Sequence, residues 1–362
     1  MKFVKVKMLF ISIMVLLSTV IPATTANALM EQYTTQRIGG QTRFDTAIEI
    51  SKEFVAKTKK PVDSVILCTG YGYADSVSAT PFAVYVNAPI LLTDKDTLTS
   101  ATQARISEMN VKKVYVIGGT GVISDNVVTT LNNMGLSVER IAGNNRFDTN
   151  RLILEKIPLT LWGKTPKFIN GYDVFSGLIV SVDTIDNDDT NKINPVVLID
   201  KNPTDDYSIS SQYIKTLSTN LYNIYGDKLH PYISINGTFL WLPDVNHNQI
   251  HSEMLNYCTS SSSESKLDSN TYPAGDNHYF SSNFVSHPYA TNSVLITTGL
   301  NYIDAISAGP LSAITYSPIV FRLPGDNNNS YSSFKTDYQD VTNIYYIGGT
   351  VVVPDGSESI LK

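Results

Sequence analysis

The chain has 362 residues, of which 42% are hydrophobic and 17% are charged, and its formal net charge is −6. This length and apolar content suffice for a substantial core and suggest two or three domains. The acidic balance argues against non-specific nucleic-acid binding, which needs a basic surface. Two cysteines, Cys68 and Cys258, are too few for a disulfide framework, and Cys68 is expected to be a small buried hydrophobe.

The first 28 residues predict a secretory signal peptide. Three lysines within the first seven residues precede an apolar run over 8–21, and an Ala-Asn-Ala sequence ends at Ala28. The apolar run is shorter than the roughly 20 residues that span a bilayer, which disfavours a membrane anchor. Cleavage after Ala28 would remove those three lysines and leave 24 basic against 33 acidic residues. We therefore expect a more acidic, secreted protein with no membrane segment after cleavage.

The next part of the chain alternates between apolar strands and helices. Arg37–Ala47 is expected to contain a strand end, a glycine turn and a helix start. The following elements are expected at Ser64–Thr69 (strand), Tyr73–Val86 (helix), Pro89–Thr93 (strand), Ser100–Met109 (helix), Lys113–Ile117 (strand), a helix capped by Ser124 or Asp125 that runs to Leu131, and Leu136–Ile141 (strand). Continuous apolar strands separated by helices indicate a parallel sheet covered on both faces.

This series of strands and helices forms a unit that occurs three times along the chain. Residues 64–92 and 293–321 align without a gap, so that Gly70 matches Gly299 and Asp75 matches Asp304. A fainter copy over 168–199 lies between them, with Gly171 in the place of Gly70 and Ser176 in the place of Asp75. Such internal repetition predicts three similar structural units.

The opening of each unit is also repeated. Arg37 and Arg43 of the first opening recur as Arg140 and Arg146 in the second. In the third opening Tyr272 replaces the first arginine and His278 replaces the second. A Gly-Gly-Thr turn ends the sheet of the first unit at residues 118–120, and it recurs as 236–238 (Asn-Gly-Thr) and 348–350. Each unit is of the size of an independent domain.

The second unit departs most from the pattern. An acidic insert at 186–191 precedes Pro195, and the stretch 204–227 is longer than its counterpart in the first unit. The insert resembles a calcium loop but lacks its glycine, so a solvated loop is the preferred interpretation. The Ser-rich stretch 260–270 is the best candidate for a linker.

Other motifs give weaker indications. Gly70-x-Gly72 follows a strand, but Asp75 stands where the third glycine of a dinucleotide fingerprint belongs, so a tight turn that offers an anion or hydroxyl site is preferred. His247 and His251 have the spacing of zinc ligands on a helix, without a partner cluster. Catalytic serine, cysteine or paired carboxylate motifs are not recognisable. We expect no metal, no cofactor and no catalytic residue.

Together these features resemble the cell wall binding repeat 2 family of Gram-positive surface proteins. The resemblance is carried by the opening at Arg37–Ala47, by Thr69–Ala79, by the Asn-Ala-Pro-Ile-Leu-Leu block at Asn87–Leu92 and by the Val-Tyr-Val-Ile-Gly-Gly turn at Val114–Gly119. It covers the chain beyond the signal. It implies an α/β fold of three tandem doubly wound, flavodoxin-like or Rossmann-like repeats with parallel sheets in a pseudo-threefold arrangement.

The resemblance also implies boundaries and a function. We expect the signal peptide at 1–28 and repeats at 37–139, 140–270 and 271–362. The implied function is noncovalent anchoring to the cell wall through an anionic polysaccharide or teichoic-acid-like polymer. A wall hydrolase, as in amidases that carry these repeats, is the alternative.

The expected polymer-binding residues are the repeated arginines, the aspartates and the turn residues. These are Arg37, Arg43, Thr69, Gly70, Asp75, Gly118, Gly119, Arg140, Arg146, Gly299, Asp304, Gly348 and Gly349. We expect Arg37, Arg43 and Arg146 to lie near junctions between units. The alternative is that each arginine pairs with a nearby aspartate, such as Asp45 or Asp148, and holds its own turn.

Overall fold

The computed structural model describes residues 33–72, 75–171, 189, 191–199, 207–229, 232–235, 238–241, 292–299, 302–322 and 340–361. The predicted signal peptide lies outside the described residues. Within the described ranges, no helix is both long and apolar enough to cross a bilayer.

The first sheet is parallel throughout, as the alternation of strands and helices predicted. Its order is β3-β2-β4-β5, and the strands are β2 (Ser64–Thr69), β3 (Ile90–Thr93), β4 (Lys113–Ile117) and β5 (Ser137–Ile141). Every residue of β2 and β3 is buried. Strands of this kind are covered by helices on both faces, which is why they read as continuous apolar runs.

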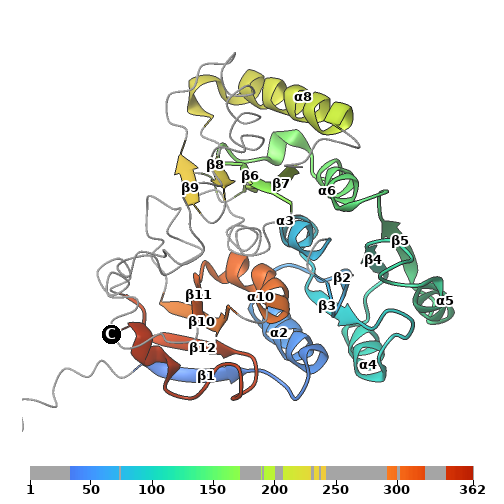
Figure 1. Cartoon of the computed structure of the whole chain (residues 1–362). Helices are drawn as coiled ribbons and strands as arrows, with labels where there is room; N and C mark the ends of the chain where they lie inside the picture. Colours follow the sequence, from blue (N-terminus) through green and yellow to red (C-terminus); the bar gives the residue numbers. More distant parts are fainter. Residues whose placement is uncertain are drawn as a thin grey trace, which may run out of the picture. The chain divides into compact units, whose positions relative to one another are not determined.

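The second complete sheet is closed by a strand from the other end of the sequence. Its order is β1-β12-β10-β11, with strands β1 (Thr34–Ile38), β10 (Ser293–Thr298), β11 (Ile319–Arg322) and β12 (Asn343–Ile347). In Figure 1 the blue β1 lies alongside the red β12. β1 holds the same place here as β5 holds in the first sheet. The strand that opens one unit therefore completes the sheet of the unit before it, and the first unit completes the third.

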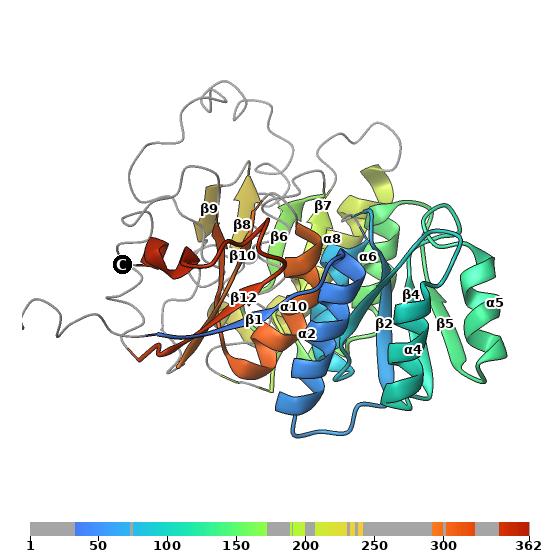
Figure 2. The same ribbon diagram turned by 90° about the horizontal axis from the view of Figure 1, so that it is seen from below.

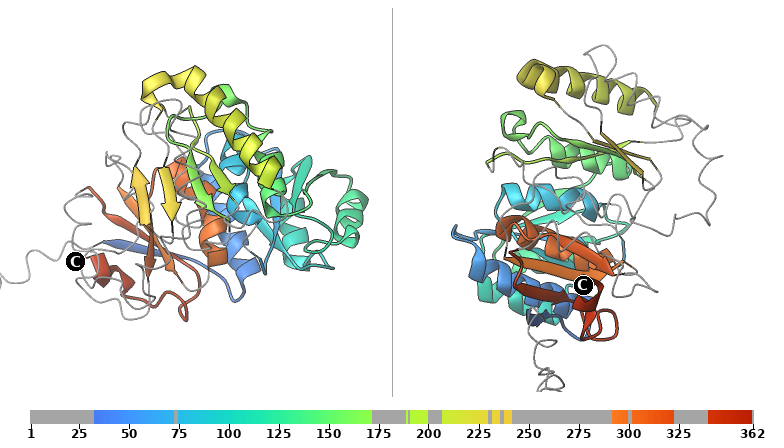
Figure 3. Two further views of the ribbon diagram at one scale, coloured as in Figure 1. Left: turned by 45° about the horizontal axis from the view of Figure 1, so that its top comes forward. Right: turned by 90° about the vertical axis from the view of Figure 1, so that its left-hand side faces the viewer.

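The middle sheet corrects one part of the prediction. Its order is β7-β6-β8-β9, with strands β6 (Lys167–Asn170), β7 (Val196–Ile199), β8 (Tyr232–Ile235) and β9 (Thr238–Trp241). β6 pairs in parallel with β7 and β8, but β8 and β9 are antiparallel. β9 occupies the edge beside β8 (Figure 3), where the other sheets carry a parallel strand from the next unit. Thr238, predicted to lie in a turn, instead begins this antiparallel strand.

The helices are mostly where the apolar periodicity placed them. They are α2 (Arg43–Lys57), α3 (Ala79–Tyr85), α4 (Ser100–Met109), α5 (Asp125–Asn133), α6 (Arg146–Leu154), α8 (Tyr207–Tyr225) and α10 (Tyr302–Thr315), with 3-10 turns at Ser76–Ser78, Leu159–Leu161, Gly226–Lys228 and Ser357–Leu361. The 19 residues of α8 account for the longer stretch of the second unit. The predicted helix Tyr73–Val86 is a 3-10 turn followed by α3. Ser124 makes no capping hydrogen bond, although it precedes α5.

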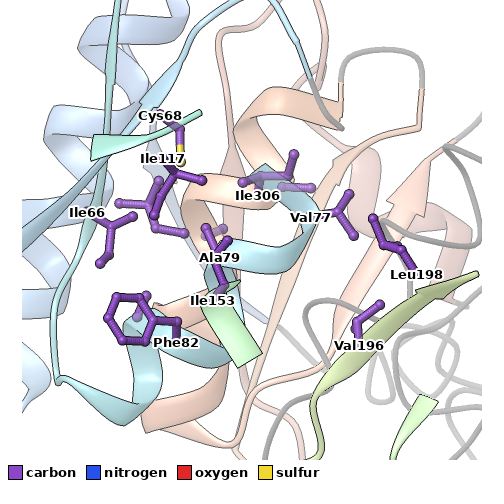
Figure 4. Packing of buried hydrophobic residues seen from close by; sticks show 14 of the residues in the cluster. Ile66, Cys68, Val77, Ala79, Phe82, Ile117, Ile153, Val196, Leu198 and Ile306 are labelled. Carbon is purple, nitrogen blue, oxygen red and sulfur yellow. The ribbon is translucent and has the colours of Figure 1, made fainter. Parts of the chain in front are cut away.

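The three units share one apolar cluster. It contains Ile66 and Phe82 of the first unit, Val196 of the second and Ile306 of the third, among others (Figure 4). Helix α2 packs against α10, and the two lie side by side in Figures 1 and 2. Because the units bury apolar surface against one another, their junctions are fixed by the core rather than by surface contacts alone.

Equivalent residues meet where the first and third units pack. A Cβ atom added to Gly309 in α10 would lie 2.5 Å from Cγ2 of Thr80 in α3. Gly309 and Thr80 are the same position of the aligned repeats. Contact between equivalent positions is expected where repeats are related by a rotation, as in the predicted pseudo-threefold arrangement.

Candidate functional site

The predicted turn residues gather at the carboxyl ends of the parallel strands. Thr69 and Gly70 end β2, Gly299 follows β10, and the Gly-Gly pairs beginning at Gly118 and Gly348 follow β4 and β12. The amides of these turns are tied to neighbouring strands, since Gly70 N–H donates to Thr93 O at 2.9 Å. In doubly wound sheets, ligands bind beyond this edge.

Arg37 and Arg140 hold these turns. Arg37 donates from Nη1 to Gly348 O at 2.8 Å and from Nη2 to Asp355 at 2.5 Å. Arg140 makes the equivalent contacts, with Gly118 O at 2.8 Å and Asp125 at 3.1 Å. Each arginine thus binds the turn that ends the sheet of the preceding unit. Their guanidinium groups are largely occupied by protein carbonyls, which favours a structural role.

Arg43 and Arg146 lie at the first residue of helices α2 and α6. Arg43 donates to Gly70 O at 2.5 Å, and Arg146 donates to Gly171 O at 3.0 Å. Both side chains are half-buried at the strand edge. A Cβ atom on Gly70 would come within 2.7 Å of the Phe44 ring, so this close approach of helix and turn requires glycine.

The local aspartates Asp45 and Asp148 take part in the first turns of α2 and α6. Asp45 accepts hydrogen bonds from Thr42 and forms a capping box with it. Asp148 instead pairs with Arg151 at 2.7 Å and accepts from the Asn144 amide. Asp45 therefore serves in a helix cap, which the sequence Thr-Arg-Phe-Asp is suited to form.

Each of the two arginines lies close enough to an aspartate of another unit to lower the pKa of that aspartate. The charge of Arg146 lowers the pKa of Asp75 in the first unit, and the Thr149 hydroxyl group lowers it too. The charge of Arg43 acts on Asp304 of the third unit. We call these the first junction (Arg146 with Asp75) and the closing junction (Arg43 with Asp304). Two candidate sites, each with an arginine of one unit and an aspartate of another, therefore lie between units.

The aspartates are tucked against the glycine turns. A Cβ atom on Gly118 would lie 2.9 Å from Asp75 Oδ2, and one on Gly348 would lie 3.0 Å from Asp304 Oδ2. Gly118 and Gly348 have φ of 109° and 115°, which L-residues rarely adopt. Both features require glycine, so the position of the aspartate in each junction depends on the Gly-Gly turn.

Burial perturbs both carboxyl groups. Asp304 is 4% exposed and its Oδ1 has no hydrogen-bond partner among the described residues. Burial raises the pKa of Asp304 to about 7, against the opposing charge of Arg43. Burial also raises the pKa of Asp75, while the Thr149 hydroxyl and Arg146 lower it. Asp304 is thus a carboxyl group that changes charge near neutral pH.

We expect the Asp304 carboxyl group to make stability depend on pH. Its pKa is about 7 in the folded protein and about 4 in an unfolded chain. Its stabilising effect is therefore complete below pH ~4 and is lost as the pH rises through about 7. The free energy of unfolding should fall by roughly 2 kcal/mol between pH 5 and pH 8 from this group. Urea unfolding at both pH values measures this change.

The matched variants are Asp304→Asn, which cannot ionise, and Asp340→Asn at an exposed position. Asp304→Asn should flatten the pH dependence, and Asp340→Asn should keep that of the wild type. Equal slopes for wild type and Asp304→Asn would contradict the burial of an ionising carboxyl group at this junction.

A cavity lies at the amino ends of the strands of the third sheet. Its volume is about 400 Å³, and Glu53, Lys57, Asn292, Ser293, Leu295, Leu311, Ile314, Thr315, Asn343 and Tyr345 line it. Ser293 and Asn343 are the first residues of β10 and β12. None of the predicted site residues lines this cavity.

Some predicted features fall outside the described residues. These are His247, His251, His278, Ser176 and most of the acidic insert, of which Asp189 and Asn191 are described. Within the described ranges, no group of three or more His, Cys, Asp or Glu side chains is placed to hold a metal ion.

Sequence reasoning missed one residue at the closing junction. Tyr71 is 61% exposed, and the guanidinium carbon of Arg43 lies 5.2 Å from the centre of its ring. Its position between the two glycines of Gly70-x-Gly72 was the available signal, because an aromatic residue in a turn at a strand edge is seldom needed for packing.

The family described as cell wall binding domain 2 matches residues 37–128 and 273–358. These segments contain both halves of the closing junction, Arg43 and Asp304, and the two Gly-Gly turns. This chain belongs to the cell wall binding domain 2 family.

Relatives with known names are longer proteins. The chain is 26% identical over 330 residues to the N-acetylmuramoyl-L-alanine amidase LytC of Bacillus subtilis, and the match covers 90% of this chain and 58% of the amidase. It is 36% identical over 113 residues to the amidase enhancer of the same organism, covering 31% of this chain and 15% of that protein. The cell wall binding domain 2 chain thus spans under two thirds of these relatives.

Solved structures share the fold. Cwp6 and Cwp8 from Clostridium difficile each match with a TM-score of 0.61, at 23% and 20% sequence identity. The matches cover 91% of this chain and 48% and 51% of the two solved chains. At this identity the likeness supports the repeated α/β fold of the cell wall binding domain 2 chain.

Proposed function

We propose that this chain attaches noncovalently to a cell wall by binding an anionic wall polymer at the junctions between its units. The observation that carries the proposal is the repeated placement of Arg43 and Arg146. Each lies at a helix N-terminus, beyond the carboxyl end of a parallel strand, and close enough to an aspartate of another unit to lower its pKa. Membership of the cell wall binding domain 2 family supports a wall component as the ligand.

The local chemistry suits phosphate or carboxylate groups. Backbone amides at a helix N-terminus and an arginine fork both favour anions. The net charge of the chain is −6, so attraction of the whole protein cannot drive association. Binding must come from local sites where the positive charge of the arginine outweighs the surrounding acids. Two such sites in one chain supply avidity on a repeating polymer.

We also propose a cellular location for the protein. A chain exported through the signal at 1–28 would meet the wall polymer outside the membrane, so we propose a location at the cell surface of a Gram-positive bacterium. The polymer is proposed to be an anionic polysaccharide or a teichoic-acid-like chain. We propose no catalytic role for the described residues.

The experiment is co-sedimentation of the protein with purified Gram-positive walls, before and after the secondary polymers are removed by acid extraction. We expect the protein to sediment with polymer-bearing walls and to remain in solution with stripped walls. Equal sedimentation with both would contradict polymer binding. A zymogram on the same walls tests the alternative, since a clearing band would favour a hydrolase.

A further inference from the structure

Tyr71 is exposed but firmly held. Arg43 lies over its ring at 5.2 Å, and the Phe44 ring meets it edge-on with centroids 6.0 Å apart. Asp94 lies near enough to the Tyr71 hydroxyl group to raise its pKa. The Arg43 and Phe44 side chains therefore hold the ring in place, while 61% of the residue stays open to solvent. An aromatic plate that is ordered before binding loses little conformational entropy when a ligand covers it.

The surroundings of the plate restrict what it can bind. Tyr71 follows β2 and Asp94 follows β3, so both lie at the carboxyl edge of the sheet, where Arg43 binds the Gly70 carbonyl group. Asp94 offers a carboxylate that accepts hydrogen bonds from hydroxyl groups, and Arg43 offers donors and positive charge. An apolar plate with polar groups at its rim matches a sugar ring, whose C–H face is apolar and whose hydroxyl groups point outward.

We propose that Tyr71 is a stacking platform for a sugar ring of the wall polymer, with Asp94 and Arg43 binding groups at the rim of that ring. This inference rests on the proposed function and narrows it. A polymer of glycerol phosphate without sugar substituents offers anionic groups to Arg43 but no ring to Tyr71. The closing junction therefore selects a polymer that carries sugar rings, and anionic groups alone do not satisfy it.

The platform is not repeated in every unit. The third unit has Leu300 at the position of Tyr71, and the middle unit has Tyr172. Both lie outside the described residues. The stacking contact is thus assigned to the closing junction, where Arg43, Asp94 and Asp304 are described together with Tyr71.

The test uses polymer-bearing Gram-positive walls with and without periodate oxidation followed by borohydride reduction. Periodate opens sugar rings that carry neighbouring hydroxyl groups and leaves phosphate groups in place. The full chain is compared with Tyr71→Leu, which removes the plate, and Tyr71→Phe, which keeps it. Tyr316→Leu is the control, because Tyr316 is also exposed but lies before β11, at the opposite edge. Thermal unfolding verifies that each variant is folded.

We expect Tyr71→Leu to weaken binding to untreated walls about tenfold, and Tyr71→Phe to weaken it about twofold. Periodate treatment should weaken the wild type to the level of Tyr71→Leu and should not weaken Tyr71→Leu further. Tyr316→Leu should behave as the wild type. Equal binding of the wild type to treated and untreated walls, or wild-type binding by Tyr71→Leu, would overturn the stacking platform while leaving wall binding intact. If the wild type binds neither wall, the proposed function fails, and the platform fails with it.

Discussion

Gly118→Ala is expected to destabilise the protein by about 3 kcal/mol or more. The backbone of Gly118 has a φ of 109°, which costs an L-residue energy whatever space surrounds it. The added Cβ would also lie 2.6 Å from Val122 Cγ2 and 2.9 Å from Asp75 Oδ2. Since domains are stable by only about 5–15 kcal/mol, this single methyl group should remove a large share. Urea unfolding of the purified variant measures the change.

The neighbouring glycine provides the control. An added Cβ on Gly119 would meet nothing within 4 Å, and its φ is not in the left-handed range. Gly119→Ala should therefore change stability by less than about 1 kcal/mol. Similar losses for the two variants would mean that the tight contact between the turn and Asp75 is not as described.

Loss of both junction arginines should have the largest effect on wall binding. Arg43→Ala or Arg146→Ala alone is expected to weaken binding about fivefold to tenfold, since each removes one charge-assisted contact. The double variant should lose more than either, about fiftyfold, because binding through two sites in one chain depends on avidity. Affinity for polymer-bearing walls, measured by co-sedimentation, gives these ratios.

Two further variants test whether the loss of binding is specific to the junction arginines and to their planar guanidinium group. Arg151→Ala removes an arginine of α6 that pairs with Asp148 and Glu155 rather than facing another unit. It should bind as the wild type does. Arg43→Lys keeps the charge but not the planar fork, so it should be intermediate. A double variant that is folded and binds like Arg151→Ala would sink the assignment of the two arginines.

The bounds of helices and strands were predicted from the sequence better than the pairing of the strands. Strand β4 and helix α4 were predicted to the residue, because a buried parallel strand and an amphipathic helix leave local patterns. The pairing of β1 with β12 joins residues that are far apart in the sequence. No local pattern encodes it. The antiparallel β9 was also missed. A short connection after β8 can lead into an antiparallel strand as well as into the turn that was predicted.

The site was predicted in its parts but not in its assembly. Repetition singled out Arg43, Arg146, Asp75 and Asp304, yet it gave no sign that the aspartate of one unit faces the arginine of the next. That relation depends on how the units pack. It also affects how the replacements at Ser176 and His278 are interpreted.

Ser176 stands for the aspartate in the second unit, and His278 stands for the arginine in the third. By sequence equivalence, these are the two halves of one junction. Both lie outside the described residues, so this correspondence rests on the sequence alone. It suggests that one junction has lost its arginine–aspartate pair as a whole, and that the other two junctions carry the proposed binding.

Hydrogen–deuterium exchange of the full chain, with and without polymer released from Gram-positive walls, tests the location of binding most directly. The account predicts slower exchange at the starts of α2 and α6 and in the turns after β2 and β4, where the arginines and glycines of the two junctions lie. The amino ends of β10 and β12, which border the 400 Å³ cavity, should exchange at an unchanged rate. Protection confined to those amino ends, with none at the arginine turns, would contradict binding at the junctions.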